Sequence, residues 1–155
     1  MMFILDTNVV SELRKVRMGK ASEPVAQWAD SVDICELYVS AITVHELEIG
    51  VLRLVRRDPV QGALLRSWLD QQVLPTFDGR VLPVDDAVAL RGAQLHVPDA
   101  QPLFDGLIAA TALVHDMTVV TRDASDFLPC GVKVFNPWQS GGAVCRPPTQ
   151  KRPTR

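Results

Sequence analysis

The sequence predicts a single α/β domain, a three-layer α/β/α sandwich around a mostly parallel central sheet. Five short apolar segments rich in β-forming residues alternate with longer segments of helical character, a pattern typical of parallel sheets covered by helices. The 155 residues fit one domain, and the composition, 47% hydrophobic and 22% charged, is that of a folded globular chain.

In the first half of the chain, capping and turn residues mark the ends of the elements. Asp6 closes the first strand and is a strong helix N-cap. Pro24 suits the first turn of a helix, because the N–H groups there have no hydrogen-bond partner within the helix and the missing N–H of proline costs nothing. The Thr43-x-x-Glu46 pattern is typical of a capping box at a helix start. The expected elements are strand 2–5, a helix through Leu13, a helix over 24–29, strand 37–42 and a helix over 43–57.

The second half continues the alternation of helices and strands. Pro59 begins one helix, Asp85 caps another, and Pro98 and Pro102 bracket a loop that leads into a third. The expected elements are helix 59–73, strand 81–84, a helix from Asp85, helix 102–115, strand 117–121 and strand 132–135.

Charge and cysteine content narrow the class of protein. No apolar run reaches the roughly 20 residues that span a bilayer, and residues 3–5 are too short for the core of a secretory signal. Three widely spaced cysteines without a CxxC pair argue against a disulfide framework and a cysteine zinc site, which predicts a reducing cytoplasm. Residues 1–135 carry 12 basic and 18 acidic side chains, a net charge of −6. Such a balance is unusual for a protein that binds nucleic acid.

Carboxylates follow several of the predicted strands at their carboxyl ends. In open α/β sheets ligands bind at this edge, so we expect these side chains to share one crevice. Each has an ordinary alternative: Asp6 and Asp123 as helix caps, and Glu46 as the partner of Thr43 in a capping box. Asp105 is harder to explain in this way, because it lies in line with an apolar helix stripe, where a charge is costly. The set comprises Asp6, Glu46, Asp105, Asp123 and Asp126.

Clustered carboxylates repel one another and need a cation at neutral pH. Oxygen ligands without histidine or cysteine at metal spacing select a hard ion, Mg²⁺ or Mn²⁺. Ions held in this way cleave phosphodiesters by activating a water and stabilising the leaving oxygen. The residues alone therefore predict a metal-dependent nuclease or phosphatase.

Five sequence blocks in a fixed order carry a family resemblance. They are ILDTNVVSEL from Ile4, SAITVHEL from Ser40, DGLIAATA from Asp105, TRDASDF from Thr121 and NPW from Asn136. Together they resemble a PIN domain, and in particular the VapC/FitB-like toxin ribonucleases of bacterial type II toxin–antitoxin modules. The resemblance covers residues 2–138 and implies a Mg²⁺-dependent endoribonuclease of the PIN fold.

The resemblance also implies residue roles. Asp6, Glu46, Asp105 and Asp123 match the family's metal-binding carboxylates, with Asp6 and Asp105 the most direct ligands. Thr7, Thr121 and Asp126 match positions that hydrogen bond to those ligands or support them; ordinary capping or strand-edge threonines are the alternative for the first two. Many relatives have Asn where this chain has Asp123.

The expected partners are an RNA substrate, a second copy of the chain in a homodimer, and an antitoxin whose basic segment enters the acidic pocket; no membrane is expected. The domain should span residues 1–138, followed by a basic, disordered tail over 139–155. Two rival functions remain open: a catalytically silent PIN domain that binds RNA or a partner, and a haloacid-dehalogenase-like phosphatase with Asp6 as nucleophile. The phosphatase family has a second Asp two residues on, where this chain has Asn8.

Three local alternatives also remain open. Arg122 could reach an RNA phosphate or pair with Asp123 or Asp126, and His45 is expected on a helix surface. The apolar residues Leu64, Leu65, Trp68 and Leu69 fit core packing or a dimer face equally well.

Overall fold

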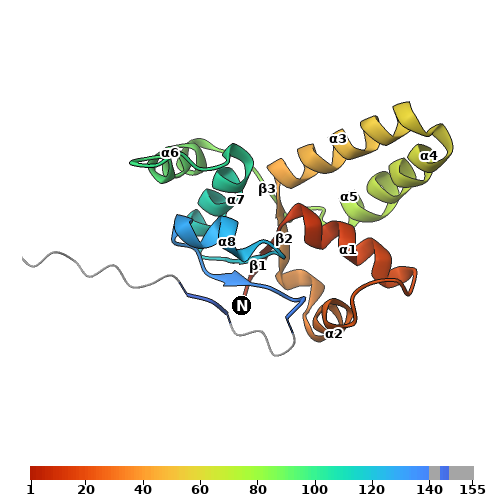
Figure 1. Cartoon of the computed structure of the whole chain (residues 1–155), viewed down its shortest axis with the longest axis horizontal. Coiled ribbons are helices and arrows are strands. Elements are labelled where there is room, and N and C mark those ends of the chain that lie inside the picture. The colour runs from red at the N-terminus through yellow and green to blue at the C-terminus, as the bar shows by residue number, and fades with distance from the viewer. Residues whose placement is uncertain (140–143, 147–155) are drawn as a thin grey trace, which may run out of the picture.

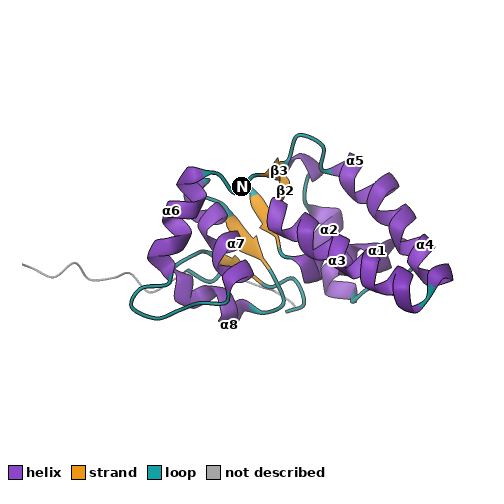
Figure 2. Ribbon diagram, turned by 90° about the horizontal axis from the view of Figure 1, so that it is seen from above, coloured by secondary structure: helices purple, strands orange, loops and turns teal. Residues whose placement is uncertain are grey.

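A five-stranded, wholly parallel sheet forms the centre of the molecule (Figures 1 and 2). The structure is a computed structural model that describes residues 1–139 and 144–146. The strand order is β3-β2-β1-β4-β5, and every neighbouring pair runs parallel. This confirms the predicted α/β class. The strands are β1 (Phe3–Leu5), β2 (Leu37–Ser40), β3 (Val81–Leu82), β4 (Thr118–Val120) and β5 (Val134–Phe135).

Helices connect the strands and cover both faces of the sheet, as Figure 2 shows. The α-helices are α1 (Thr7–Arg17), α2 (Glu23–Ser31), α3 (Ala41–Arg57), α4 (Pro59–Trp68), α5 (Leu74–Thr76), α6 (Asp86–Leu95), α7 (Leu103–Val114) and α8 (Ala124–Phe127). Two short 3-10 segments, η1 (Ile34–Glu36) and η3 (Leu128–Cys130), and a π-helical segment, η2 (Leu69–Val73), complete the described elements.

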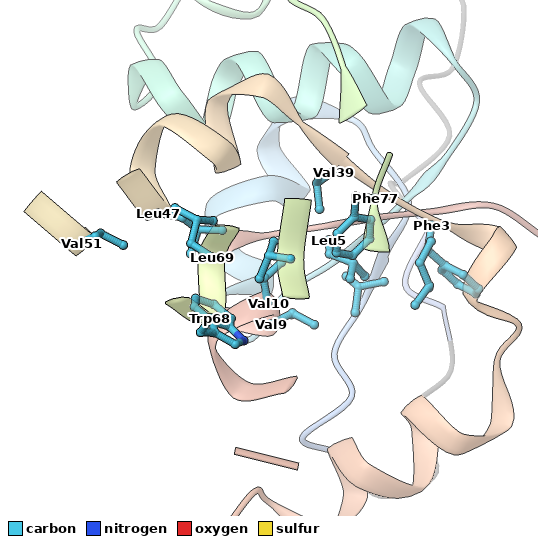
Figure 3. Close-up of a cluster of buried hydrophobic side chains, with 13 residues drawn as sticks. Phe3, Leu5, Val9, Val10, Val39, Leu47, Val51, Trp68, Leu69 and Phe77 are labelled. Carbon is cyan, nitrogen blue, oxygen red and sulfur yellow. The ribbon is translucent and has the colours of Figure 1, made fainter. Parts of the chain in front are cut away.

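The alternation of side chains along β1 divides the core into two layers. Phe3 and Leu5 point into one cluster, which helices α1, α3 and α4 and segment η2 cover (Figure 3). Ile4 points to the other face and packs against Ile108 of α7 and Phe127 of α8. Of the three β1 side chains, Ile4 and Leu5 are fully buried and Phe3 is nearly so, as expected for a sheet sandwiched between helices.

The register of the central strands fixes where the carboxylates lie. Leu5 is paired with Val39 of β2 and with Val120 of β4, so these three strands end at the same level. The next residue along β1 is Asp6, whose backbone N–H donates to the Val120 carbonyl at 2.9 Å. The parallel sheet therefore brings residues that follow β1, β2 and β4 to one edge, as predicted.

Two of the differences from the predicted helices have a clear local cause. Helix α3 begins at Ala41, because the Ser40 hydroxyl caps it by accepting from the Ile42 N–H at 3.0 Å. Thr43 is thus inside the helix and buried, and the expected capping box with Glu46 is wrong.

The predicted helix 59–73 is also not one regular helix. It changes to a π-helical turn at Leu69, where the Leu74 N–H donates to the Leu69 carbonyl. Pro75 follows immediately; it has no N–H to donate, and its ring crowds the preceding turn. The expected apolar face is divided accordingly: Trp68 and Leu69 are buried, whereas Leu64 is 55% exposed.

Most of the expected C-terminal tail, residues 140–143 and 147–155, lies outside the described residues. Within the described part, Cys145 forms an antiparallel bridge with Val134, with backbone hydrogen bonds of 2.9 and 2.8 Å. None of the helices in the described ranges has the length and apolar character needed to cross a membrane.

Candidate functional site

Asp6 is the most buried acidic side chain at the sheet edge, with 7% of its surface exposed. Its Oδ1 accepts from the Thr7 N–H at 2.8 Å at the start of α1, and its Oδ2 accepts from the Thr121 hydroxyl at 2.8 Å. Burial raises its pKa, the two hydrogen bonds oppose this, and the charges of Glu46 and Asp123 add to the rise. Asp6 is thus a helix cap and a member of the carboxylate set at once.

Glu46 reaches the same edge from the second turn of α3. Its Oε1 accepts from the Thr7 hydroxyl at 2.9 Å, which links α3 to the start of α1. The neighbouring His45 is exposed, as expected, and its ring packs edge-on against Phe104 of α7, with centroids 5.5 Å apart. This contact places the start of α7 beside α3, and with it Asp105.

Asp105 lies in the first turn of α7 and is half-buried. Burial, as the largest cause, and the charges of all four other carboxylates together raise its pKa from 3.8 to about 6. Asp105 therefore lies within electrostatic range of the whole set, which comprises Asp6, Glu46, Asp123 and Asp126.

Asp123 follows β4 and is held by a side chain of α1. Its Oδ2 accepts from the Asn8 amide at 3.0 Å, and its backbone N–H donates to the Thr121 hydroxyl at 3.0 Å. Its carboxylate does not cap helix α8, so the capping alternative is not what the structure contains. The contact between Asn8 and Asp123 joins positions 115 residues apart and has no local signal in the sequence.

The carboxylates of this set have no cationic partner among the described residues, since every ion pair there involves other acids. Their oxygen-only chemistry suits a hard divalent ion. Within residues 1–139 and 144–146, no three potential ligands lie close enough to form a ready-made metal cage. Mg²⁺ needs none, because it binds through one or two carboxylates and retains several waters. The chemistry of the donors therefore fits such an ion.

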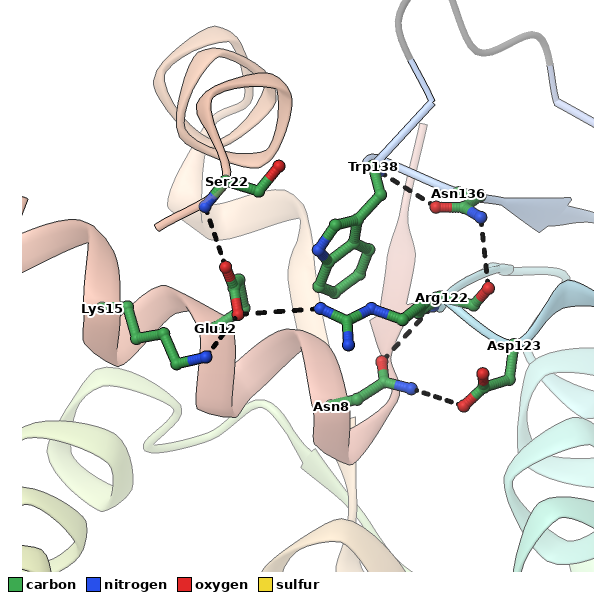
Figure 4. Close-up of polar contacts among 8 residues, drawn as sticks. All are labelled: Asn8, Glu12, Lys15, Ser22, Arg122, Asp123, Asn136 and Trp138. Carbon is green, nitrogen blue, oxygen red and sulfur yellow. Dashed lines mark hydrogen bonds and ion pairs between the residues drawn. The ribbon is translucent and has the colours of Figure 1, made fainter. Parts of the chain in front are cut away.

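A second polar network adjoins the carboxylates (Figure 4). The guanidinium of Arg122 lies 4.3 Å from the ring centre of Trp138, and its Nη2 is 3.9 Å from Oε2 of Glu12. Arg122 thus pairs with Glu12. The expected alternative, an ion pair between Arg122 and Asp123 or Asp126, is wrong. Glu12 is buried on α1, and its pKa is lowered, chiefly by the hydrogen bond from the Ser22 N–H and then by Lys15 and Arg122.

Sequence reasoning missed the importance of Glu12, although a signal was present. Glu12 is three residues after the fully buried Val9, so it lies in line with the apolar stripe of α1. A carboxylate in line with an apolar helix stripe is also the signal that points to Asp105.

These features define the class of the protein. A model of the PIN domain family matches residues 3–127, and the chain belongs to that family. Membership of the PIN family excludes the alternative that the chain is a haloacid-dehalogenase-like phosphatase.

Two curated relatives align over nearly the whole chain. It is 42% identical to Toxin FitB of Neisseria gonorrhoeae over 143 residues, which cover 88% of this chain and 99% of that protein. It is 38% identical to VapC ribonuclease Y4jK of Sinorhizobium fredii, over 89% of this chain and 99% of the relative. The crystal structure of FitAcB from N. gonorrhoeae matches with a TM-score of 0.80 and 41% identity, over 89% of this chain and 99% of that one.

Proposed function

We propose that this protein is a metal-dependent endoribonuclease that hydrolyses RNA phosphodiester bonds with Mg²⁺, or with Mn²⁺ in its place. The observation that carries the proposal is the position of Asp105, whose pKa is raised to about 6 within range of four other carboxylates, none of them ion-paired among the described residues. A set of carboxylates without cationic partners is suited to a divalent ion, and capping accounts only for Asp6. The name of the S. fredii relative, a ribonuclease, supports RNA as the substrate.

In this proposal the residues have separate tasks. Asp6 and Asp105 bind the ion, and both lie on rigid elements, Asp6 at the end of β1 and Asp105 in the first turn of α7. A divalent ion in such a site polarises the phosphate and lowers the pKa of a bound water. Glu46, fixed by the Thr7 hydroxyl, and Asp123, fixed by the Asn8 amide, complete the ligand shell or orient the attacking water.

The supporting residues act through the carboxylates. Thr121 donates to Asp6 and thereby favours its ionised form, which is the form that binds a metal. Thr7 orients both Asp6, through its backbone N–H, and Glu46, through its hydroxyl. Asp126 contributes charge, since it is among the groups that raise the pKa of Asp105.

We further propose that the enzyme is a toxin controlled by an antitoxin. Two relatives support this: the one named Toxin FitB, and the structure of FitAB bound to an IR36 DNA fragment, which matches with a TM-score of 0.80 and 40% identity. An antitoxin with an arginine-bearing segment fits the site, because unpaired carboxylates accept charge-assisted hydrogen bonds from a guanidinium. Such a segment would take the place of the ion.

A cytoplasmic homodimer is the proposed form of the free toxin. Exposed apolar side chains on the α3–α4 hairpin support self-association, among them Leu52, Val60 and Leu64. Light scattering coupled to size-exclusion chromatography tests the dimer; a monomer at micromolar concentration would contradict it.

The test of the catalytic proposal is cleavage of a fluorophore-labelled RNA by the purified protein. We expect cleavage with Mg²⁺, none in EDTA, and recovery when Mg²⁺ is added in excess. Cleavage that continues in EDTA would contradict the metal dependence. A protein that binds RNA but leaves it intact with either ion would favour the catalytically silent alternative.

A further inference from the structure

Arg122 is held in a defined position beside the carboxylates, although its side chain is 52% exposed. Its guanidinium stacks on Trp138 at 4.3 Å, and its Nη2 faces Oε2 of Glu12 at 3.9 Å (Figure 4). An exposed arginine ordinarily samples many rotamers, so a side chain with a ring on one side and an anion on another is pre-organised.

Glu12 holds two cations on one buried carboxylate. Its side chain is 7% exposed, Oε1 accepts from the Ser22 N–H at 2.9 Å, and Oε2 is 3.2 Å from Nζ of Lys15 as well as facing Arg122. Lys15 is 54% exposed. One buried negative charge therefore fixes two half-exposed positive charges, and the group keeps a net positive charge at the surface.

The backbone of Arg122 connects this group to the carboxylate set. Its N–H donates to Oδ1 of Asn8 at 3.4 Å, and the amide of the same Asn8 donates to Asp123 at 3.0 Å. On the other side the Arg122 carbonyl accepts from the Asn136 amide at 3.1 Å, and Asn136 in turn accepts from the Trp138 N–H at 3.0 Å. The position of the guanidinium is thus tied to that of Asp123.

The carboxylates of this site repel the phosphates of an RNA substrate, and a fixed arginine beside them offsets this repulsion. The planar guanidinium matches a phosphate in shape and charge and can bind it through two N–H groups. Its contact with Glu12 is long, and five N–H donors are available on the fork, so donors remain for a ligand. Since residues 1–135 carry a net charge of −6, a fixed positive group next to the carboxylates is the exception on this domain.

We propose that Arg122, assisted by Lys15 and held in place by Glu12 and Trp138, binds a backbone phosphate of the RNA next to the phosphodiester that is cleaved. The site is a binding site for a nucleic-acid phosphate, separate from the carboxylates that bind the ion. It rests on the proposed ribonuclease function, of which it defines the substrate path.

The first test compares Arg122→Ala with Arg91→Ala, which removes the same charge from an exposed position on α6. Fluorescence anisotropy in EDTA measures the affinity of each metal-free protein for a single-stranded RNA over a salt series, and steady-state cleavage with Mg²⁺ gives KM. We expect Arg122→Ala to weaken binding about tenfold, since one charge-assisted hydrogen-bonded contact is lost. The slope of log affinity against log salt should become shallower by about 0.7, and KM should rise. Arg91→Ala should leave the affinity, the salt slope and KM unchanged.

The second test separates a fixed arginine from a merely favourable charge. Glu12→Gln keeps an oxygen that can accept from the Ser22 N–H but removes the negative charge that orients Arg122 and Lys15. If only net charge matters, RNA should bind more tightly to this variant; if the arginine must be held, RNA should bind more weakly. We expect weaker binding. Trp138→Leu, which removes the stacking face alone, should act in the same direction and serves if Glu12→Gln does not fold.

The outcomes distinguish this site from the function on which it rests. A wild-type protein that cleaves RNA, with Arg122→Ala matching it in affinity, salt slope and KM, would overturn the phosphate site and leave the nuclease standing. Tighter binding by Glu12→Gln would likewise overturn the role of Glu12. A wild-type protein that neither binds nor cleaves RNA would overturn the proposed function itself.

Discussion

The hydroxyl of Thr121 joins two acidic residues: it donates to Oδ2 of Asp6 at 2.8 Å and accepts from the backbone N–H of Asp123 at 3.0 Å. Thr121 is fully buried at the end of β4, directly beside the end of β1. One oxygen atom therefore orients the most buried carboxylate of the site and the turn that carries another.

The Thr121→Val substitution keeps the shape of this side chain and removes its hydroxyl. Asp6 then loses a donor and the Asp123 N–H loses an acceptor, which costs roughly 1–3 kcal/mol of the free energy of unfolding. Metal affinity and RNA cleavage should also fall, because ionised Asp6 is less stabilised. Urea unfolding and calorimetric titration with Mg²⁺ check both effects. Thr121→Ser retains the hydroxyl and should behave like the wild type; equal losses in both variants would show that the methyl group, not the hydroxyl, matters.

The raised pKa of Asp105 makes the metal-free fold sensitive to pH. Because its pKa is about 6 in the fold against an ordinary 3.8, the folded state holds this proton more tightly than the unfolded chain. Its contribution to stability is fully present below pH 4 and is lost as the pH rises through 6. Asp105→Asn removes this loss, so in EDTA its Tm should exceed that of the wild type increasingly from pH 4 to pH 7, by roughly 2–4 °C for each kcal/mol.

Asp30→Asn is the control for this pH series, since it removes the same charge from an exposed position on α2, outside the carboxylate set. Addition of Mg²⁺ should raise the wild-type Tm at pH 7 and leave Asp105→Asn almost unchanged. A Tm difference for Asp105→Asn that does not vary with pH would contradict the electrostatic account.

Helices α3 and α4 pack closely at one glycine. A Cβ added at Gly62 would lie 2.4 Å from the Val55 Cα, a backbone atom that cannot move aside by changing a rotamer. Gly62→Ala should therefore lower the free energy of unfolding by about 1–3 kcal/mol. Gly50→Ala, in the same hairpin with nothing within 4 Å, should be neutral or stabilise by up to about 1 kcal/mol through helix propensity. Thermal melts of the pair decide this, and equal Tm values would refute the close approach.

The C-terminal tail is expected to be dispensable for catalysis. Truncation after Gln139 removes four basic residues and also the bridge from Cys145 to Val134 on the edge strand β5. The maximal rate should be unchanged, and any loss should appear only at low RNA concentration and shrink as salt rises, because phosphate contacts are salt-sensitive. A lower maximal rate at saturating RNA would show that the tail supports the site.

The sequence predicted the sheet because its strands are short, apolar and separated by helices, and because strand ends coincide in a parallel sheet. That rule, together with the costly position of Asp105 on an apolar helix stripe, predicts that Asp6, Asp105 and Asp123 share one edge. The resemblance to the PIN domain came from the five sequence blocks, and the family match over residues 3–127 confirms it. One local error came from competing caps: Ser40 and Thr43 are both plausible N-caps three residues apart, and only the end of β2 decides between them.

Contacts between distant segments could not be predicted in this way. Asn8 contacts Asp123 across 115 residues, and Arg122 pairs with Glu12, and neither pairing leaves a spacing or periodicity in the sequence. The buried position of Glu12 could be inferred from the stripe of α1, but the identity of its partners depends on how β4 and α1 meet in the fold.

The most direct test of the central claim is metal-dependent RNA cleavage by Asp6→Asn and Asp105→Asn, measured beside Asp30→Asn as a control of equal chemistry. We expect each of the first two to lose cleavage at saturating Mg²⁺ while its circular dichroism spectrum stays that of the wild type. The Tm of Asp105→Asn in EDTA should not fall. Asp30→Asn should cleave at the wild-type rate. Full activity in Asp6→Asn or Asp105→Asn would contradict the assignment of this carboxylate set as the catalytic centre.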